Sequence, residues 1–379
     1  MARQGASKFL NKAKKSKSDE FYTQYVDIQK EVEAYLEYNP DTFRGKVVYC
    51  NCDDPFESNF FRYFILNFER IGLKSLITTS YKPSPVANTQ LGLFGDNDTV
   101  KQKKGRPKVT ANKFIINSVG DIDGDGEFSL KDVALQLKQN KKNEWAPLDE
   151  DGDFRSAESI ELLQQADFVI TNPPFSLFRE FVKQLVDYDK KFLIIGNINS
   201  ISYREVFSLV KENKAWLGTG MGRWISGFIV PDTYELYGTE ARIDEDGNRI
   251  IATNNCLWLT NLDHGKRHQP LPLMTMNDNI KFSSHKDIKG IGYKKYDNYD
   301  AIEVPYTDAI PNDYDGLMGV PITFLDKYNP DQFEIVGSDY EIKEGKLPEI
   351  VNPDWQGKID RGYINGKRIY SRILIRRKK

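Results

Sequence analysis

The sequence predicts an α/β protein built on a doubly wound, mostly parallel sheet, followed by a smaller mixed α+β region. Short apolar runs such as Phe168 to Ile170 are typical of strands buried on both faces. They alternate with segments whose apolar residues recur at helical spacing, which predicts β-α-β units with right-handed crossovers. With 379 residues, 39% of them hydrophobic and 28% charged, the chain is long enough for two domains.

The predicted elements follow one another regularly along the first part of the chain. Phe60, Phe61 and Phe64 lie on one helical face, and Gly72 is a favourable C-cap for that helix. Ser176 is a favourable N-cap for a later helix. In order, the sequence predicts a helix within 18–38, a strand within 46–55, a helix at 56–72, a strand at 73–81, a helix at 157–165, a strand at 168–170, a helix from Ser176, a strand at 191–198 and a helix at 203–213.

Two changes of pattern suggest how the chain is divided. Residues 82–150 are rich in proline, glycine, asparagine and charge, and they are too long for an ordinary loop, so they are predicted to be an insertion. Beyond Trp216 the pattern becomes hairpin-like, with strands predicted within 227–231 and 256–262. Tight turns are predicted at DEDGNR (244–249) and INGKR (364–368), because D-G and N-G dipeptides favour hairpins.

The basic residues are segregated along the chain. The net charge is −2, from 53 basic and 55 acidic residues. Even so, three segments, 1–17, 101–108 and 366–379, hold six, five and seven basic residues and no acid. Such segments can neutralise phosphates, although each alone could be a solvated surface stretch. Together they predict a polyanionic partner, and the candidate phosphate contacts are Lys12, Lys14, Lys15 and Lys17.

Cysteine usage and hydropathy indicate the compartment. The three cysteines, Cys50, Cys52 and Cys256, are odd in number and lack a zinc-ligand spacing, which is typical of a reducing environment. No apolar run reaches membrane length, and the basic amino terminus has no apolar signal-peptide core. We therefore expect a cytoplasmic location.

The stretch ADFVITNPPFSLF (166–178) is the first candidate for chemistry. Its apolar strand is followed by Asn172-Pro173-Pro174-Phe175, where two prolines force the chain out of the sheet. Ligands bind at such strand ends in open α/β sheets. The Asn172 side-chain oxygen and the Pro173 carbonyl can accept both protons of one planar amine, and Phe175 can stack on the ring that carries it. The alternative is a structural turn.

Carboxylates occur where the other half of a site would lie. Asp153 in GDFRS is predicted near the end of the preceding strand, and Asp53 and Asp54 follow the first strand of the sheet. Such carboxylates suit a ligand with an amine, ribose hydroxyls and positive charge, and S-adenosylmethionine has all three. A glycine-rich pyrophosphate loop is absent, which argues against dinucleotides.

These motifs resemble those of amino-methyltransferases, and the chain is similar in particular to the EcoRI-type adenine-specific DNA methyltransferases. The resemblance is carried by DEFYT (19–23), GDF (152–154) and NPPF (172–175), and it is weakest over 82–150 and 338–366. It implies that NPPF activates the target amine. It also implies contacts to S-adenosylmethionine through the residues Tyr22, Thr23, Asp153 and Phe154, with Asp53 and Asp54 standing where broader methyltransferase families have a glycine-rich motif.

The resemblance also implies a fold and an activity. The fold would be a Rossmann-like methyltransferase sheet in a catalytic domain at 1–262, with target recognition in a region at 263–379. The activity would be transfer of a methyl group to adenine N6 in duplex DNA, without a metal, after the base is flipped out. A restriction endonuclease acting on the same site would be a partner. The alternatives are a methyltransferase of the same chemistry acting on RNA or protein glutamine, and an inactive DNA-binding regulator on the same fold.

Two further motifs lie inside the predicted insertion. Residues 121–132 read DIDGDGEFSLKD, close to an EF-hand calcium loop, but no helix is evident before it, and an acidic turn without an ion is the simpler interpretation. Residues 104–108, KGRPK, resemble the core of a minor-groove hook. The alternative interpretation is an ordinary basic loop.

Overall fold

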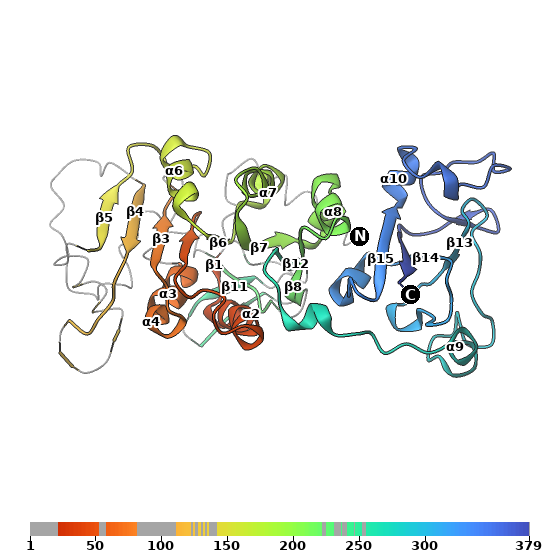
Figure 1. Ribbon diagram of the computed structural model, residues 1–379, viewed down its shortest axis with the longest axis horizontal. Helices are drawn as coiled ribbons and strands as arrows, with labels where there is room; N and C mark the ends of the chain where they lie inside the picture. Colours follow the sequence, from red (N-terminus) through yellow and green to blue (C-terminus); the bar gives the residue numbers. More distant parts are fainter. Residues whose placement is uncertain are drawn as a thin grey trace. The chain divides into compact units, whose positions relative to one another are not determined.

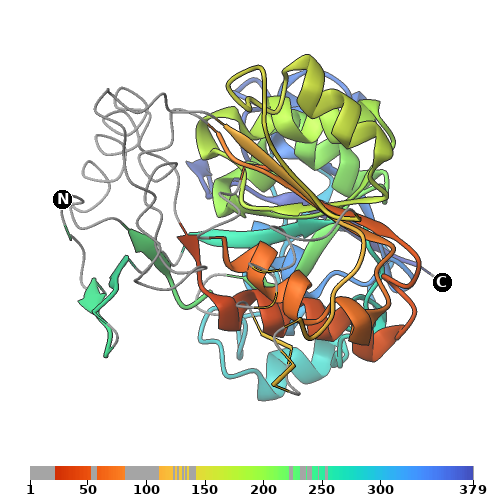
Figure 2. The same cartoon turned by 90° about the vertical axis from the view of Figure 1, so that its left-hand side faces the viewer.

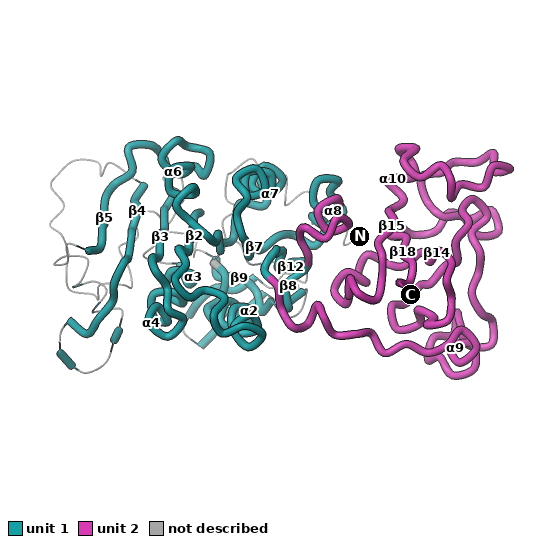
Figure 3. The backbone as a smooth tube through the Cα atoms, viewed as in Figure 1, with its two compact units in different colours: residues 1–206, 217–262 teal, residues 207–216, 263–379 magenta. Residues whose placement is uncertain are grey.

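The computed structural model describes residues 22–52, 58–81, 111–122, 124–125, 128–129, 132, 135, 142–221, 225–230, 236, 241–245, 247–251 and 255–378. Its two compact units are coloured in Figure 3: unit 1 comprises 1–206 and 217–262, and unit 2 comprises 207–216 and 263–379. Residues 207–216, which the sequence-based division placed in the first part, therefore belong to unit 2. The roles predicted for the two parts stay predictions.

Unit 1 is built around an eight-stranded sheet with the order β5-β4-β3-β2-β6-β7-β12-β8 (Figure 1). The strands of this sheet are β2 (Val47–Cys50), β3 (Ser75–Thr79), β4 (Asn112–Ile116), β5 (Glu144–Pro147), β6 (Phe168–Thr171), β7 (Lys191–Asn197), β8 (Trp216–Met221) and β12 (Cys256–Thr260).

The sheet is mixed, so the prediction of a mostly parallel sheet was too simple. Its centre, β3-β2-β6-β7, is parallel as predicted, but β4 and β5 on one side and β12 on the other are antiparallel to their neighbours. The predicted insertion at 82–150 supplies β4 and β5. Antiparallel strands need no crossover helix, so a segment without helical periodicity can still extend the sheet.

Helices cover both faces of the sheet, as a doubly wound fold requires. In Figure 2, α2, α3 and α4 lie on one face and α6 and α7 on the other. The helices of this part of the chain are α2 (Tyr25–Tyr38), α3 (Asn59–Leu66), α4 (Phe68–Ile71), α6 (Ala157–Gln165), α7 (Phe178–Asp187) and α8 (Arg204–Lys211), with 3-10 turns η1 (Phe175–Leu177) and η2 (Ile198–Ser202).

Local signals set several of these helix ends. The Ser58 hydroxyl caps α3 by accepting from the amides of Phe60 and Phe61. Gly72 ends α4 in the left-handed conformation, with φ of 66°, as predicted. The predicted cap at Ser176 was wrong, because the Leu177 amide donates to the Pro174 carbonyl at 3.0 Å and winds a 3-10 turn before α7 begins.

A second, smaller sheet of unit 1 has the order β1-β9-β11-β10. Its strands are β1 (Tyr22–Thr23), β9 (Phe228–Val230), β10 (Arg242–Ile243) and β11 (Arg249–Ile251). The turn predicted at 244–249 is confirmed, because β10 and β11 pair antiparallel around it and Gly247 has φ of 83°. The pairing of β1 with β9 joins the start of the described chain to a distant segment.

Unit 2 is a mixed α+β structure around a four-stranded sheet of order β13-β14-β18-β15, in which only the β13–β14 pair is parallel. The hairpin predicted at 364–368 is confirmed, with Asn365 and Gly366 both at positive φ. The elements are β13 (Ala301–Glu303), β14 (Leu317–Val320), β15 (Phe333–Ser338), β16 (Tyr363–Ile364), β17 (Lys367–Arg368), β18 (Ile373–Arg377), α9 (Met276–Phe282), α10 (Asp339–Lys343), η4 (Gly265–His268), η5 (Thr307–Ala309), η6 (Ile322–Lys327) and η7 (Pro348–Ile350).

A charged pair lies inside unit 2. Arg372, just before β18, donates through Nε to Oε1 of Glu303 on β13 at 3.1 Å. The two side chains are only 11% and 12% exposed. The Tyr296 hydroxyl donates to the same carboxylate, so the buried charge of Glu303 is held by two partners.

None of the helices in the described part of the chain combines the length and the apolar character needed to cross a bilayer.

Candidate active site at the end of the parallel strands

The strand order places a topological switch point between β2 and β6. From β2 the chain moves outward to β3, whereas from β6 it moves the opposite way to β7, so the connections diverge at this pair. Ligands of open α/β sheets bind where the order reverses. The hydroxyl of Thr171, the last residue of β6, donates to the carbonyl of Asn51, just past β2, and thereby joins the two strand ends.

The Asn172-Pro173-Pro174-Phe175 loop starts at this point. Asn172 is half-buried and Pro173 is buried, so the loop leaves the sheet close against the protein. The half-buried Phe175 packs against the hydrophobic core of unit 1, and its ring meets the edge of Phe228 on β9 at a centroid distance of 6.4 Å. The loop therefore places the side-chain amide of Asn172 and the ring of Phe175 at the switch point.

The small sheet brings a second predicted motif to this loop. Thr23 on β1 is the pairing partner of Phe228, the residue whose ring contacts Phe175. Asn59, in the first turn of α3, donates its side-chain amide to the Thr23 carbonyl at 2.9 Å. Tyr22 shares β1 and pairs with Ile229. The structure thus joins the last two residues of DEFYT, Tyr22 and Thr23, to NPPF through β9, a connection that no local sequence signal indicates.

Two buried polar atoms belong to these segments, one on β1 and one just past β2. Thr23 is 3% exposed and Asn51 is 2% exposed. Neither the Thr23 Oγ1 atom nor the Asn51 Oδ1 atom has a hydrogen-bond partner among the described residues. Buried polar atoms are normally paired, so these two can bind a polar ligand. Cys52, the next residue after Asn51, has φ of 67°, a left-handed conformation that is strained for a side chain with a Cβ.

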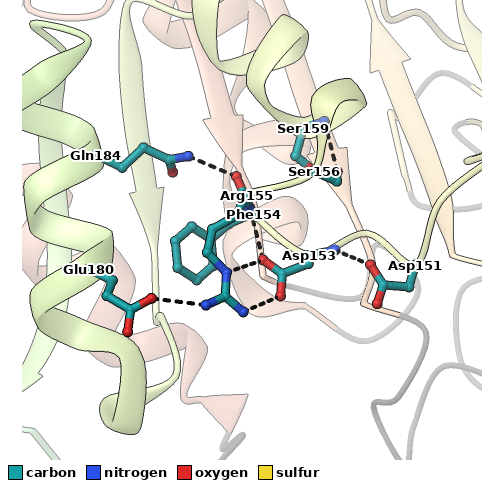
Figure 4. Close-up of polar contacts among 8 residues, drawn as sticks. All are labelled: Asp151, Asp153, Phe154, Arg155, Ser156, Ser159, Glu180 and Gln184. Atoms are coloured by element: carbon teal, nitrogen blue, oxygen red, sulfur yellow. Dashed lines mark hydrogen bonds and ion pairs between the residues drawn. The ribbon is translucent and has the colours of Figure 1, made fainter.

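Asp153 is held in a fixed orientation by an ion-pair network, which Figure 4 shows. Its carboxylate accepts from Arg155 Nε at 2.9 Å and from Nη2 at 2.7 Å. Arg155 also donates to Glu180 on α7 at 2.9 Å. Gly152 packs on the end of β3, because a Cβ there would lie 2.0 Å from the Ser80 carbonyl oxygen. Asp153 therefore lies in a loop anchored between β3 and α7.

The sequence-based placement of Asp153 at a strand end was wrong, because β5 already ends at Pro147. Its neighbour Phe154 is 4% exposed and meets the Phe181 ring of α7 edge-on at 5.1 Å. The Gln184 amide also donates to the Phe154 carbonyl at 3.0 Å (Figure 4). The Phe154 ring thus anchors the loop, and its contact with a cofactor stays a prediction.

A buried carboxylate on α2 binds the backbone of β8, and sequence reasoning missed it. Glu31 accepts from the Thr219 amide at 2.7 Å and from the Gly220 amide at 2.9 Å. A Cβ at Gly218 would lie 2.3 Å from Glu31 Oε1, so this close approach requires glycine. Burial raises the pKa of the Glu31 carboxyl. The available signal was an acid on the same helical face as the apolar Ile28 and Val32.

Asp27, one turn earlier on α2, holds the residues that lead into β9. Its Oδ2 atom accepts from both the amide and the hydroxyl of Ser226 at 2.9 Å. The Gln24 side chain adds a bond to the Gly227 carbonyl at 3.1 Å. Burial raises the pKa of the Asp27 carboxyl. Since Phe228 follows directly, this helix face fixes the strand behind the Phe175 ring.

We expect Asp27→Ala to lower the free energy of unfolding by about 1–3 kcal/mol, because both Ser226 donors lose their acceptor in a part-buried place. Asp27→Asn is the control, since an amide oxygen can accept the same two bonds without burying a charge. Urea titration followed by tryptophan fluorescence measures the difference. Equal destabilisation by the two variants would contradict the role of the acceptor.

The acidic loop at 121–132 binds its own backbone. Asp132 is fully buried and accepts from the amides of Ile122 and Ser129, each at 2.8 Å, while Asp121 accepts from the Gly124 amide at 2.7 Å. That the loop is an acidic turn without an ion stays a prediction. In the described part of the chain, no group of three or more His, Cys, Asp or Glu side chains is arranged to hold a metal ion.

Several predicted site residues lie outside the described residues. These are Asp53, Asp54, Asp123, the four lysines Lys12, Lys14, Lys15 and Lys17, and the basic segment 101–108.

Comparison with known proteins gives matches over the whole chain. A family model described as adenine-specific methyltransferase EcoRI matches residues 9–378. The chain is 49% identical to the Type II methyltransferase M.EcoRI of Escherichia coli, across 100% of this chain and 99% of the relative. It is 33% identical to the Type II methyltransferase M.MpnI of Mycoplasma pneumoniae, with 98% of each protein covered. It is 34% identical to the Type II methyltransferase M.MgeORF184P of Mycoplasma genitalium, with 97% of this chain and 98% of that protein covered. No solved structure matched.

Proposed function

The chain belongs to the EcoRI-type adenine-specific methyltransferase family, and on this premise we propose that it transfers the methyl group of S-adenosylmethionine to N6 of adenine in duplex DNA. As a member of this family it is a site-specific DNA methyltransferase that acts on adenine. The observation that carries the proposal is the position of the NPPF loop, which starts at the switch point between β2 and β6.

The loop's own groups can activate the amine. Asn172 Oδ1 and the Pro173 carbonyl oxygen each accept one N–H of the adenine amine, which localises the nitrogen lone pair. When bound, S-adenosylmethionine supplies an electrophilic methyl group. The nitrogen forms its new bond to carbon as the carbon–sulfur bond breaks, and the nitrogen then loses a proton to solvent. No covalent bond to the protein is needed.

Two buried polar atoms fit the methyl donor. Thr23 Oγ1 and Asn51 Oδ1 are buried without partners among the described residues, and a ligand with ammonium, carboxylate and hydroxyl groups can bond to both. Asp153 would accept from the adenine amine of the donor. We assign Tyr22, Phe154, Asp53 and Asp54 to the same binding site by family resemblance.

The target adenine must leave the duplex to reach the loop, because its amine is otherwise paired inside the helix. Phe175 would then stack on the flipped base while Asn172 holds its amine. The strand order supports a Rossmann-like methyltransferase fold for the catalytic part, residues 1–262. We assign target recognition to residues 263–379. We also propose, as a partner, a restriction endonuclease that acts on the same DNA site.

The direct test uses the purified chain with isotopically labelled S-adenosylmethionine and a mixture of duplex fragments. We expect label in DNA as N6-methyladenine at one repeated sequence, identified by digestion and mass spectrometry. Label that appears only in RNA or on protein glutamine would instead support the other substrates that a planar amine site can take. Absence of any transfer, with duplex binding retained, would support an inactive regulator.

Asp153→Ala is expected to weaken S-adenosylmethionine binding about tenfold, which corresponds to the loss of one hydrogen bond to a charged group. The matched control is Glu180→Ala, which removes the other carboxylate bound by Arg155 and leaves Asp153 in place. Isothermal titration calorimetry measures both affinities. If Asp153→Ala binds like the control, the adenine of the cofactor lies elsewhere.

A further inference from the structure

We propose that the segment 281–295 of unit 2, the end of α9 and the loop after it, contacts the phosphates of duplex DNA. The proposal rests on the proposed function, which requires a DNA-binding surface, and it names a place for that surface that the sequence analysis did not single out. We call this segment the lysine loop.

The lysine loop concentrates exposed positive charge. Its five lysines are all exposed, and within the part of the chain that the structure describes none forms an ion pair: they are Lys281, Lys286, Lys289, Lys294 and Lys295. Its one acid, Asp287, accepts a hydrogen bond from the Tyr306 hydroxyl at 3.0 Å. Such a set of lysines can bind the phosphate backbone of DNA. Each phosphate that a lysine neutralises releases condensed counterions, and this release favours binding.

The acidic side chains near the lysine loop are bound to a hydroxyl, a backbone amide or a histidine ring rather than to these lysines. Asp278 accepts from the Thr275 hydroxyl at 2.7 Å, and Asp313 accepts from the Met276 amide at 2.6 Å. Asp308 lies 2.8 Å from the His285 ring nitrogen. The acids lower the local charge, but they leave the lysine ammonium groups available to a ligand.

The obvious basic segment at the carboxyl terminus behaves differently. Arg368 pairs with Asp360 at 2.6 Å, and Arg376 lies 3.8 Å from Glu334. Arg372 is buried against Glu303. Three of its seven basic residues are thus engaged with carboxylates of unit 2, whereas none of the five lysines of the lysine loop forms an ion pair within the described residues.

The lysine loop is held in one conformation. The Gly290 amide donates to the Ile280 carbonyl at 2.8 Å, which folds the loop back onto α9. The His285 ring stacks on Tyr306 with a centroid distance of 3.7 Å. The Tyr293 hydroxyl donates to the Ala309 carbonyl at 2.6 Å. Since the backbone is already ordered, binding DNA costs less conformational entropy than ordering a mobile tail.

Two large apolar side chains lie among the lysines. Phe282 is 68% exposed and Ile291 is 64% exposed. Exposed apolar side chains beside lysines can pack on the sugars and bases of a duplex, which lysines alone cannot do. Their exposure therefore favours DNA over a purely solvated stretch.

The experiment compares two triple variants of the full chain. Lys286, Lys289 and Lys294 are replaced by glutamine in the test variant. The control replaces three exposed lysines of unit 1 that lie at the amino ends of β2, β3 and β7, opposite the candidate active site: Lys46, Lys74 and Lys191. Affinity for a target and a non-target duplex is measured at several salt concentrations, together with the methylation rate at saturating DNA.

We expect the test variant to weaken binding to both duplexes by similar factors, because phosphates carry no sequence information. Its slope of log affinity against log salt should fall by about 2–3, since each lost contact contributes about 0.9. The control should keep both the wild-type slope and the wild-type methylation rate at saturating DNA. Slopes that match between test variant and wild type would overturn the proposal while the methyltransferase activity stands. A wild-type chain that neither binds nor methylates duplex DNA would overturn the proposed function itself.

Discussion

Replacing Asn172 by alanine is expected to lower the rate of methyl transfer by about 100-fold or more, while binding of the methyl donor stays close to that of wild type. The substitution removes one of the two acceptors that localise the lone pair of the adenine amine, and preorganised polar groups of this kind contribute about two to three orders of magnitude to rate. The donor is assigned to other residues, so its affinity should not follow the rate.

Single-turnover transfer to a saturating duplex, with calorimetry of donor binding beside it, measures the two quantities separately. Asn172→Asp is the matched control, because a carboxylate can accept the same N–H group and should restore a large part of the rate. Transfer by Asn172→Ala at the wild-type rate would remove Asn172 from the chemistry. Loss of donor binding together with rate would instead indicate that the loop itself had collapsed.

Replacing Arg372 by alanine is expected to lower the free energy of unfolding of unit 2 by about 3–5 kcal/mol. Breaking a buried pair from one side leaves an uncompensated charge in the interior, here on Glu303, whose side chain is 12% exposed. The Tyr296 hydroxyl alone would remain bound to it. Since a whole domain is stable by only about 5–15 kcal/mol, the loss is large.

Arg376→Ala, on β18 itself, provides the control, because its pair with Glu334 is 3.8 Å long and both side chains are about half exposed. Exposed pairs of this kind contribute about 0–1 kcal/mol. Hydrogen exchange of the β18 amides reports on unit 2 separately from unit 1. Similar exchange in the two variants would show that the Glu303 charge is solvated or has another partner.

Local signals were sufficient for many elements of the fold. The helix at 157–165 and the end of α4 at Gly72 were predicted because caps and helical periodicity act within a few residues. The hairpin turns at 244–249 and 364–368 followed from the conformations that glycine and asparagine allow. In each case the interacting residues are close to one another in the sequence.

Long-range pairing could not be predicted in the same way. The antiparallel edges of the large sheet and the β1–β9 pair depend on partners far away in the sequence, and strand patterns do not specify a neighbour. For the same reason the NPPF loop was found from its own residues, whereas its connection through Phe228 to Thr23 required the structure. Glu31 was missed because an acid on a helix is usually exposed, and its burial depends on donors contributed by Thr219 and Gly220.

The position of β12 between β7 and β8 affects how the chain can fold as it leaves the ribosome. β7 and β8 are synthesised first, but each pairs with β12, which ends at Thr260. At about 5–20 residues per second, several seconds pass between the end of β8 and the end of β12. During this interval the edge of β7 that β12 will occupy has no partner from the sheet, and unpaired strand edges invite association with other chains. The nascent protein is therefore most prone to associate with other chains just before its large sheet is complete.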